Sequence, residues 1–528
     1  MMFISFLVLP LLTSPCIEAF KILVFYPFPS LSHQSAIMAL TERLVRDGHE
    51  LFVISPNVVP GLTGHVNYTH VDLSFSYQYI PDENNAEDEG VNLQRIWSKW
   101  ELPLLWKALA RIARKQLQSE TFLQFDRRVA AERINFDLFI VEFYYLPFSC
   151  AILRNYTKSA PIITLSSMPT DFLTEETLGS FEHLSFSPSL FSDYTDRMSL
   201  LQKLDNWISH YYIVSKLNEE LDISVRRYCK EAYGPEYEMI ADGCKSRISL
   251  SLIASNAMYG FPRLLGPNVI ETGPLHIRVP KELPQDLKNW LDGAEKGVIY
   301  FSLGCNLRGK SLNEEIRANF LKVFAQLQPL GYRVLWKWEL DEKIPGQSSN
   351  ILAQKWIPQH SVLAHPNIKV FITQGGLQSF QEAVHHGVPM VGIPWFVDQE
   401  FNVAKMVDAG IGVKLPPKNL HSYEDIKLAL ETVLHDKKYS DNMKKHSAIS
   451  HDLTSRAMDQ AVFWVEHVAR HKGASHLRPS AADASLFEFF CFDIISVILC
   501  LGLTIVYFLF KLLVGIVFKK IGAKTKLS

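Results

Sequence analysis

The chain has no excess of charge of either sign. Its 528 residues include 53 Lys and Arg against 55 Asp and Glu, which gives a formal net charge of −2 at pH 7. A protein that binds nucleic acid through the phosphate backbone usually carries a basic surplus. We therefore expect no nucleic-acid partner, and local sites must carry the function.

Cysteine is also scarce, with seven residues in the whole chain. Cys16 lies near the N-terminus, and Cys491 and Cys500 lie in or beside the apolar C-terminal stretch. The other four are Cys150, Cys229, Cys244 and Cys305, and their spacing matches no zinc site. Four cysteines allow three pairings, of which one contains a Cys229–Cys244 disulfide. No acidic metal-binding pair is present either, so we expect no metal and no cofactor.

The N-terminus has an apolar core of about ten residues, too short to span a bilayer, followed by the small residue Ala19. Residues 1–19 are therefore predicted to be a secretory signal peptide, with a mature chain that starts near Phe20. Two glycan acceptor sequences begin at Asn67 and Asn155. They agree with a luminal body.

Residues 494–518 form an apolar stretch with one charge, Lys511. As a helix this stretch reaches about 37 Å, enough to cross the hydrocarbon layer with some tilt. Lysines at 519, 520, 524 and 526 follow it, which places the tail, residues 519–528, in the cytosol. Lys524 and Lys526 resemble a dilysine retrieval signal. The sequence thus predicts a single-pass type I protein of the endoplasmic reticulum membrane.

Apolar runs of strand length alternate with helical patterns along the luminal part. The runs lie at residues 21–26, 51–54, 138–141, 162–165 and 249–254, and again at 298–303, 334–337, 368–373, 390–393 and 412–415. Such alternation predicts an α/β fold with parallel sheets covered on both faces.

A stretch with three prolines, residues 273–287, separates the two sets of strands and is predicted to be a linker. The N-terminal domain would then span residues 20–272 and the C-terminal domain residues 288–455. A helix from Arg456 to Arg470 opens a connecting segment, residues 456–493, before the membrane helix. The basic amphipathic pattern at residues 93–118, interrupted by Pro103, is interpreted as ordinary packing against the core; the alternatives are lining of a small-molecule pocket and contact with a membrane surface.

The strand at residues 368–373 ends on Gln374, Gly375 and Gly376, which open a helical stretch running to His386. Glycines allow close backbone approach, and a helix N-terminus favours an anion, so this turn is predicted to seat a phosphate. Asp398 and Gln399 follow the next strand and are expected at the same edge of the sheet.

The segment from Trp356 to Asn402 resembles the signature of the UDP-glycosyltransferase family. The resemblance implies the GT-B fold, in which two Rossmann-like domains face each other across a cleft. It also implies a set of donor-binding residues: Trp356 on uracil, Gln359 on the nucleoside, Gly376 and Ser379 on the diphosphate, Glu382 on the ribose hydroxyls, and Asp398 and Gln399 on the sugar, with Gln374, Gly375 and Gln378 in the same loop and helix start. Gln374 stands where many members have His, and insect members often show Gln there.

The loop after the strand at residues 298–303 is expected to face the diphosphate through backbone N–H groups near Ser302, Gly304 and Cys305. Many relatives have Ser in place of Cys305. Because helix ends and backbone donors can neutralise the leaving group, no metal is required.

The resemblance places a catalytic histidine in the loop after the first strand, where this chain has His33. A histidine near a helix N-terminus is kept neutral and can act as a general base. Glu142 stands where the family uses Asp, after the strand at residues 138–141, and is expected to orient the ring. Attack opposite the leaving group implies inversion at the sugar.

These features favour a membrane-anchored enzyme that transfers a hexose, with glucose preferred, from a UDP-sugar to small lipophilic phenols or alcohols. The alternative is a non-catalytic sugar-nucleotide-binding membrane protein or receptor with the same fold. A sugar-nucleotide epimerase shares the architecture but needs neither a signal nor a span. The sequence is compatible with a homo-oligomer.

Overall fold

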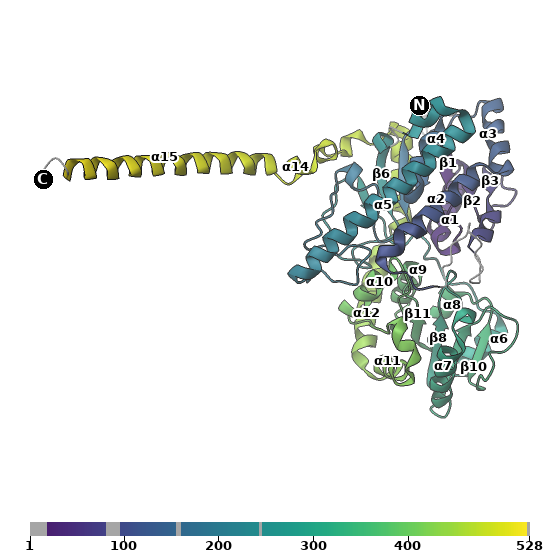
Figure 1. Ribbon diagram of the computed structural model, residues 1–528. Coiled ribbons are helices and arrows are strands. Elements are labelled where there is room, and N and C mark those ends of the chain that lie inside the picture. Colours follow the sequence, from purple (N-terminus) through teal and green to yellow (C-terminus); the bar gives the residue numbers. More distant parts are fainter. Residues whose placement is uncertain (1–17, 81–94, 155–159, 242–244, 525–528) are drawn as a thin grey trace, which may run out of the picture.

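The computed structural model describes residues 18–80, 95–154, 160–241 and 245–524 (Figure 1). Most of the predicted signal peptide, the glycan acceptor Asn155, Cys244 and Lys526 lie outside these residues. Asn67 lies just before a strand, at the surface of the N-terminal part.

The first sheet has seven parallel strands in the order β3-β2-β1-β4-β5-β6-β7. They are β1 (Lys21–Phe25), β2 (Glu50–Ser55), β3 (Tyr68–Asp72), β4 (Leu138–Glu142), β5 (Ile162–Ser166), β6 (Ile248–Ile253) and β7 (Val269–Glu271). The central strands are buried on both faces, which is why their sequences read as continuous apolar runs. We call the part built on this sheet the N-terminal domain.

The second sheet has six parallel strands in the order β10-β9-β8-β11-β12-β13. They are β8 (Gly297–Ser302), β9 (Tyr332–Lys337), β10 (Ile351–Gln354), β11 (Ile368–Thr373), β12 (Met390–Gly392) and β13 (Gly412–Lys414). This sheet is the basis of the C-terminal domain. The α/β class and all ten predicted strands are confirmed.

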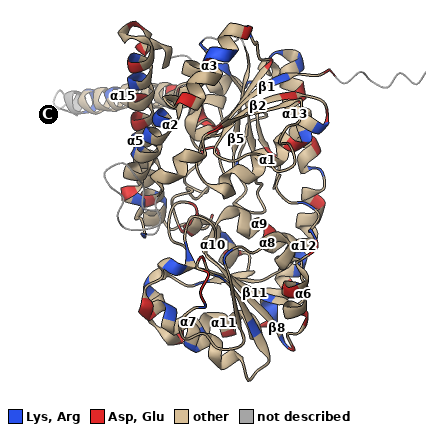
Figure 2. Ribbon diagram, turned by 90° about the vertical axis from the view of Figure 1, so that its right-hand side faces the viewer, with Lys and Arg blue, Asp and Glu red and all other residues tan. Residues whose placement is uncertain are grey.

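Helices cover both sheets (Figure 1). In the N-terminal domain they are α1 (Leu31–Arg46), α2 (Leu102–Leu117), α3 (Glu120–Glu132), α4 (Ser149–Leu153) and α5 (Leu200–Tyr233). In the C-terminal domain they are α6 (Gln285–Asp292), α7 (Glu314–Leu327), α8 (Gln359–Leu363), α9 (Leu377–His385), α10 (Gln399–Asp408), α11 (Tyr423–His435) and α12 (Lys437–Thr454). Figure 2 shows both signs of charge scattered over the two domains, in line with the balanced composition.

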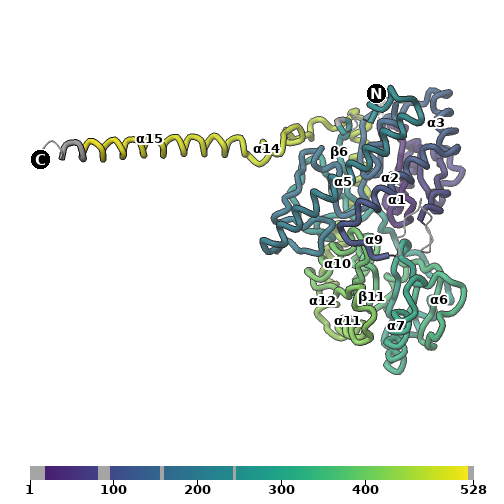
Figure 3. Tube along the Cα trace, viewed as in Figure 1, coloured from purple at the N-terminus to yellow at the C-terminus, as the bar shows by residue number. Residues whose placement is uncertain are grey.

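The chain then returns to the N-terminal domain (Figure 3). Helix α13 (Ala457–His471) packs Ala461, Val465 and Val468 into the apolar core that lies under α1. After α14 (Leu486–Phe489), helix α15 (Phe492–Lys524) leaves the body. Its residues Phe492–Lys520 are long and apolar enough to cross a membrane, and none of this window is buried. The predicted span is thus confirmed as a membrane-spanning candidate.

Three expectations were wrong. His33 lies in the first turn of α1 and not in a loop, because the helix begins at Leu31 directly after the N-cap Ser30. Cys229 is a free, buried cysteine, whereas Cys150 is disulfide-bonded, so a pairing that uses Cys229 is excluded. Pro103 does not interrupt a helix either, because it occupies the first turn of α2, where no backbone N–H is needed.

Candidate functional site

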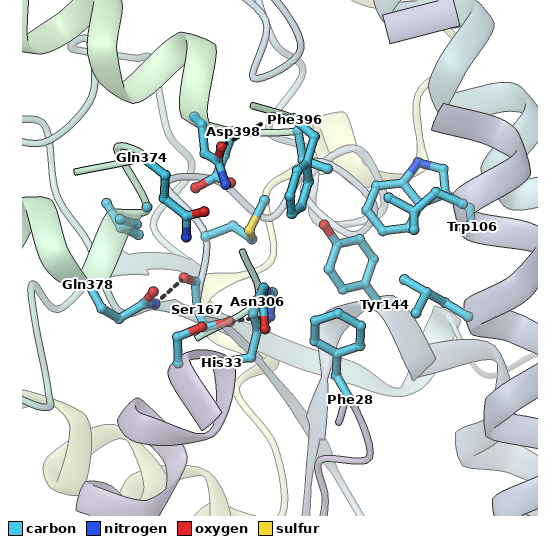
Figure 4. A pocket seen from close by; sticks show the side chains of 18 residues that line it. Phe28, His33, Trp106, Tyr144, Ser167, Asn306, Gln374, Gln378, Phe396 and Asp398 are labelled. Atoms are coloured by element: carbon cyan, nitrogen blue, oxygen red, sulfur yellow. Dashed lines mark hydrogen bonds between the residues drawn. The ribbon is translucent and has the colours of Figure 1, made fainter. Parts of the chain in front are cut away.

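The carboxyl edges of the two sheets face each other, and two connected cavities lie between them. The reaction cavity, of about 60 Å³, is lined by residues of both domains, including His33, Tyr144, Gln374 and Asp398 (Figure 4). The donor cavity, of about 380 Å³, lies against the C-terminal domain. Ser32, Gln374, Gly376 and Gln378 line both. A single elongated ligand can therefore extend from one cavity into the other.

His33 lies at the floor of the reaction cavity. Its Nδ1 is 3.0 Å from Oγ of Ser167 and 3.4 Å from Oε1 of Glu142. The edge of its ring packs against Phe28, with ring centroids 4.5 Å apart. Both polar contacts use Nδ1, so Nε2 is the ring atom that can take a proton from a substrate.

Glu142 ends β4 and is fully buried behind His33. Its Oε2 accepts a hydrogen bond from the backbone N–H of Phe28 at 3.2 Å. Burial raises the pKa of the Glu142 carboxyl, and the neighbouring His33 opposes part of that rise. A buried carboxylate beside the ring is an arrangement that can stabilise an imidazolium as it forms.

Ser167 was not among the predicted residues. It follows β5, and its backbone carbonyl accepts a hydrogen bond from the side chain of Gln378 in the C-terminal domain at 2.9 Å. A second link joins Ser30, the N-cap of α1, to the side chain of Asn306 at 3.0 Å. Both links flank His33, so the position of the ring is coupled to the contact between the domains.

The glycine turn before α9 has the geometry of an anion seat. Gly375 has φ +83°, a conformation that side chains rarely adopt, and Gly376 is the N-cap of α9. The free N–H groups of the first turn of α9 therefore open into both cavities. Gly375 does not line either cavity itself but forms the turn behind them.

Gln374 lies between this turn and the loop after β8. Gly304 of that loop has φ +84°, and a Cβ built on it would lie 2.6 Å from Nε2 of Gln374. The positive φ favours glycine at position 304, and the Gln374 amide packs directly against Gly304. Oε1 of Gln374 is buried and has no hydrogen-bond partner among the described residues. Ser302 and Cys305 line the donor cavity next to them, as predicted.

A hydrogen-bond network joins the predicted nucleoside residues. Oε1 of Gln359 accepts from the Tyr300 hydroxyl at 3.1 Å, and its Nε2 donates to Ser379 at 3.0 Å and to Glu382 at 2.9 Å. Burial raises the pKa of Glu382 to about 7, opposed by the hydrogen bond from Gln359. A carboxylate held in this way can accept bonds from two adjacent ribose hydroxyls.

Trp356 is 62% exposed at the mouth of the donor cavity. A large aromatic side chain left open to solvent beside such a network provides a face on which a flat base can stack. Lys337 and His276 also line this cavity and were not predicted. The Lys337 ammonium donates to the Gly304 carbonyl at 3.0 Å and to Glu339 at 2.9 Å. Burial lowers the pKa of His276 to about 3.

Asp398 lies above the reaction cavity (Figure 4), and Gln399 also lines this cavity. Burial raises the pKa of Asp398, opposed by a hydrogen bond from Asn402 at 2.8 Å. Oε1 of Gln399 accepts from the backbone N–H groups of Trp395 at 2.7 Å and Phe396 at 3.2 Å. It thereby supports a turn in which Val397 has the strained value φ +55°. Nε2 of Gln399 can donate to a ligand.

The rest of the reaction cavity is apolar. Its wall consists of side chains from α2 and from the loops after β1, β4, β5 and β12, namely Phe28, Leu105, Trp106, Leu109, Tyr144, Met168, Phe396 and Val397. The Tyr144 hydroxyl and Nε1 of Trp106 are buried, and neither has a hydrogen-bond partner in the part of the chain that the structure describes. The amphipathic pattern predicted at residues 93–118 thus contributes, through α2, to a small-molecule pocket.

The structure brings all the predicted donor and catalytic residues to this region, with Gly375 and Glu142 directly behind the lining. It adds Ser167, Asn306, Lys337, His276, Tyr144 and Trp106. Ser167 and Lys337 follow or end parallel strands, so their position at the strand edge was the signal that could have identified them. Among the described residues, no group of three or more His, Cys, Asp or Glu side chains could hold a metal ion.

Comparisons with known proteins agree with this site. The family model described as UDP-glucoronosyl and UDP-glucosyl transferase matches residues 21–527. UDP-glycosyltransferase UGT5 of Dactylopius coccus is 30% identical over 97% of this chain and 94% of its own length. UDP-glucosyltransferase 2 of the same species and UDP-glucuronosyltransferase 2B9 of Macaca fascicularis are each 29% identical over 91% of this chain and 90% of their own lengths.

Among solved structures, the glycotransferase of kitacinnamycin superposes with a TM-score of 0.54 at 16% identity, covering 84% of this chain and 98% of that protein. At this identity the likeness concerns the fold, and it confirms the predicted GT-B arrangement. The match over nearly the whole chain, together with a donor cavity built from the signature residues, identifies a glycosyltransferase. The chain belongs to the UDP-glucuronosyl and UDP-glucosyl transferase family.

Proposed function

We propose that the protein transfers glucose from UDP-glucose to a hydroxyl group of a small lipophilic phenol or alcohol, with inversion at the sugar. The observation that carries this proposal is the position of His33. It lies between an apolar wall and the sugar end of the donor site, with Nδ1 held by Ser167 and Glu142.

The reaction uses His33 as general base. Nε2 takes the proton of the acceptor hydroxyl as its oxygen attacks C1 of the sugar from the face opposite the diphosphate. The bond from C1 to the diphosphate oxygen breaks, and UDP leaves with that electron pair. The proton stays on His33, whose positive charge the Glu142 carboxylate stabilises. An α-linked donor thus gives a β-linked product.

The donor is held by the residues that line the donor cavity. Trp356 stacks on uracil, Glu382 binds the ribose hydroxyls, and the N-terminus of α9 with the Gly304 loop binds the diphosphate. The Lys337 ammonium adds positive charge near the Gly304 loop. Because this donor set consists of backbone N–H groups and a cation, we propose that the leaving group is neutralised without a metal or other cofactor.

Glucose is favoured over glucuronate on charge grounds. Asp398 and Gln399 are the polar groups above the sugar end, and the described residues that line the reaction cavity include no Lys or Arg. The carboxylate of a glucuronosyl group would lie near the buried Asp398 carboxyl without a cation to compensate it. A neutral hexose can instead donate its hydroxyl groups to Asp398.

We further propose that the body lies in the lumen of the endoplasmic reticulum, with glycans on Asn67 and Asn155 and a short cytosolic tail. The support is the leader, the apolar helix α15 and the lysines that follow it. Conjugation of lipophilic compounds at this membrane suits a role in detoxification. Glycosidase treatment of the protein from microsomes would lower its mass if these sites are modified.

The decisive experiment supplies the full-length protein in membranes with UDP-glucose, UDP-glucuronate and a mixed set of phenols and sterols, and identifies products by mass. We expect glucosides from the wild type, and a loss of about 10²–10⁴-fold in His33→Ala with donor affinity retained. His421→Ala, at an exposed histidine paired with Glu315, is the control. Glucuronides without glucosides would contradict the proposed donor. Donor binding without any product would favour the non-catalytic alternative.

A further inference from the structure

The N-terminal part of α5 exposes its apolar side chains to solvent. Leu200, Leu201, Leu204, Trp207 and Ile208 are between 46% and 82% exposed. Their spacing of three and four residues places them on one helix face. We call these five residues the α5 stripe. A helix on the surface of a soluble protein normally turns such a face inward, so the stripe requires an explanation.

The opposite, buried face of this part of α5 is polar. The Asn206 side chain donates to the backbone carbonyls of Leu184 and Ser187 at 2.9 and 3.0 Å and accepts from the backbone N–H of Ser189 at 2.8 Å. His210 contacts the Ser189 hydroxyl at 3.0 Å through Nδ1. These four specific contacts would be lost or changed if the helix rotated. The outward orientation of the stripe is therefore built into the fold.

Neighbouring residues extend the exposed apolar surface. Trp100, 46% exposed, lies with its ring centroid 5.7 Å from that of Tyr212 on α5, and Leu104, in the first turn of α2, is 60% exposed. An ion pair between Lys99 and Asp205 ties this part of the chain to α5. These contacts show that the N-terminal part of α5 adjoins the start of α2.

The same region is attached to the segment that leads into α15. The ring centroids of Phe181 and of Phe489 in α14 are 4.4 Å apart, and the His183 ring contacts both Phe489 and Phe490. The chain from Phe181 to Ser189 is in turn the segment that Asn206 and His210 bind. A continuous series of contacts thus connects the base of the membrane helix to the α5 stripe.

The views agree with this connection. In Figure 1, the end of α5 near the start of α2 reaches toward the side from which α15 leaves the body. In Figure 2, seen at 90° to the first view, α5 and α15 lie at the same edge of the molecule. A bilayer crossed by α15 therefore lies on the side of the molecule toward which this end of α5 reaches.

We propose that the α5 stripe is a second membrane contact, inserted into the luminal interface of the bilayer that α15 spans. Leu and Ile side chains enter the acyl boundary, and Trp207, Trp100 and Tyr212 suit the headgroup level, where aromatic side chains with a polar atom concentrate. The lipid surface is the proposed partner for two reasons. Helix α15 fixes the position of the bilayer, and the contacts described above connect the α5 stripe to the segment that enters the bilayer.

Tryptophan quenching in the full-length protein tests this contact. The protein is reconstituted into phosphatidylcholine vesicles with and without phospholipids brominated near the headgroup end of the acyl chain. We expect lipid-dependent quenching in the wild type, a reduced quenching in Trp207→Phe and its loss in the double variant W100F/W207F. Trp290→Phe is the control, since Trp290 lies on α6 in the C-terminal domain, outside both cavities, and its removal should leave the lipid-quenched component unchanged.

Two results would overturn the proposal. One is quenching by brominated lipid that is the same in wild type and W100F/W207F. The other is pairing of two copies of the chain through the α5 stripe. It would appear as a dimer mass in nanodisc preparations that reverts to a monomer mass in L204E/I208E, while W207F leaves the quenching by lipid unaltered. Retained UDP-glucose binding by each variant confirms that it is folded.

Discussion

Nδ1 of His33 lies closer to the hydroxyl of Ser167, at 3.0 Å, than to the carboxylate of Glu142, at 3.4 Å. The ring is thus held by a pair of groups with different roles. Under the proposed mechanism, the hydroxyl would set the orientation of the ring, whereas the buried carboxylate would fix the tautomer and stabilise the charged ring.

We predict that Glu142→Gln lowers kcat by about 10²–10⁴-fold, because an amide can donate to Nδ1 and so favour the tautomer that lacks a free Nε2 lone pair. Ser167→Ala should lower kcat by only about tenfold, which is the loss of roughly one hydrogen bond. Steady-state kinetics across pH, with donor affinity by calorimetry, separates the two. Equal losses in both variants, or recovery of neither in Glu142→Asp and Ser167→Thr, would contradict these roles.

Donor affinity should depend on pH through Glu382, whose pKa burial raises to about 7. Ribose hydroxyls donate to the ionised carboxylate, so binding of UDP-glucose should strengthen by roughly tenfold between about pH 6 and pH 8. For folding alone, a carboxyl with a raised pKa contributes stability below its unfolded value of 4.5, and the contribution is lost as pH rises through about 7.

Calorimetric titration with UDP-glucose checks this dependence. UDP itself is unsuitable, because its terminal phosphate titrates at about pH 6. Glu382→Gln should bind more weakly at pH 8 and show a nearly flat profile. A profile that keeps its slope in this variant would assign the titration to another group.

The unpaired hydroxyl of Tyr144 is expected to select acceptors. Tyr144→Phe should change the free energy of unfolding by less than about 0.5 kcal/mol, because the hydroxyl makes no hydrogen bond to any residue that the structure describes. Its kcat/KM should fall severalfold for phenols that carry a second polar group and stay constant for simple alkylphenols. Equal losses for both acceptor sets would argue against this role.

Asp398 and Gln399 should differ in what they support. Asp398→Asn is expected to lower kcat/KM for UDP-glucose by about 10²-fold with UDP affinity unchanged, since Asp398 lines the reaction cavity and not the part of the site proposed to bind UDP. Gln399→Ala should also lower stability, by about 1–3 kcal/mol, because it leaves two buried backbone N–H groups without an acceptor. Thermal unfolding beside kinetics distinguishes the two, and a stability loss confined to Asp398→Asn would reverse the assignment.

If lipophilic acceptors reach the reaction cavity from the bilayer, the α5 stripe should affect KM. We predict that L204E/I208E raises KM severalfold for acceptors that partition into vesicles and leaves KM unchanged for a water-soluble phenol. L428E, at an exposed position of α11 in the other domain, is the matched control. An increase in KM for both acceptors would point to damage within the cavity.

The strands of both sheets were predictable because buried parallel strands are apolar without interruption. The strands that were missed, β3, β7 and β10, lie at the sheet edges, where partial exposure allows polar residues such as His70 and Gln354 and removes that signal. The donor site was predictable because its residues are nearly contiguous in the chain.

The missed groups are those whose role depends on a distant partner. Nothing adjacent to Ser167 in sequence indicates that it contacts His33, 134 positions away. Helix α5, which exposes its apolar face and buries its polar face near Asn206, is a similar case. Asn206 and His210 become inward residues only through hydrogen bonds to the segment Leu184–Ser189, and a periodicity analysis assigns polar residues to the solvent side.

Two contacts join the domains beside His33, one between Gln378 and Ser167 and one between Asn306 and Ser30. They bear on hydrolysis of the donor sugar by water. If the two domains separate, the proposed general base His33 loses the support that these two contacts give to Ser167 and to the start of α1. We therefore expect hydrolysis of the donor sugar to be slow while water has access to the site. The same two contacts would then both align the base for the acceptor and limit loss of the sugar to water.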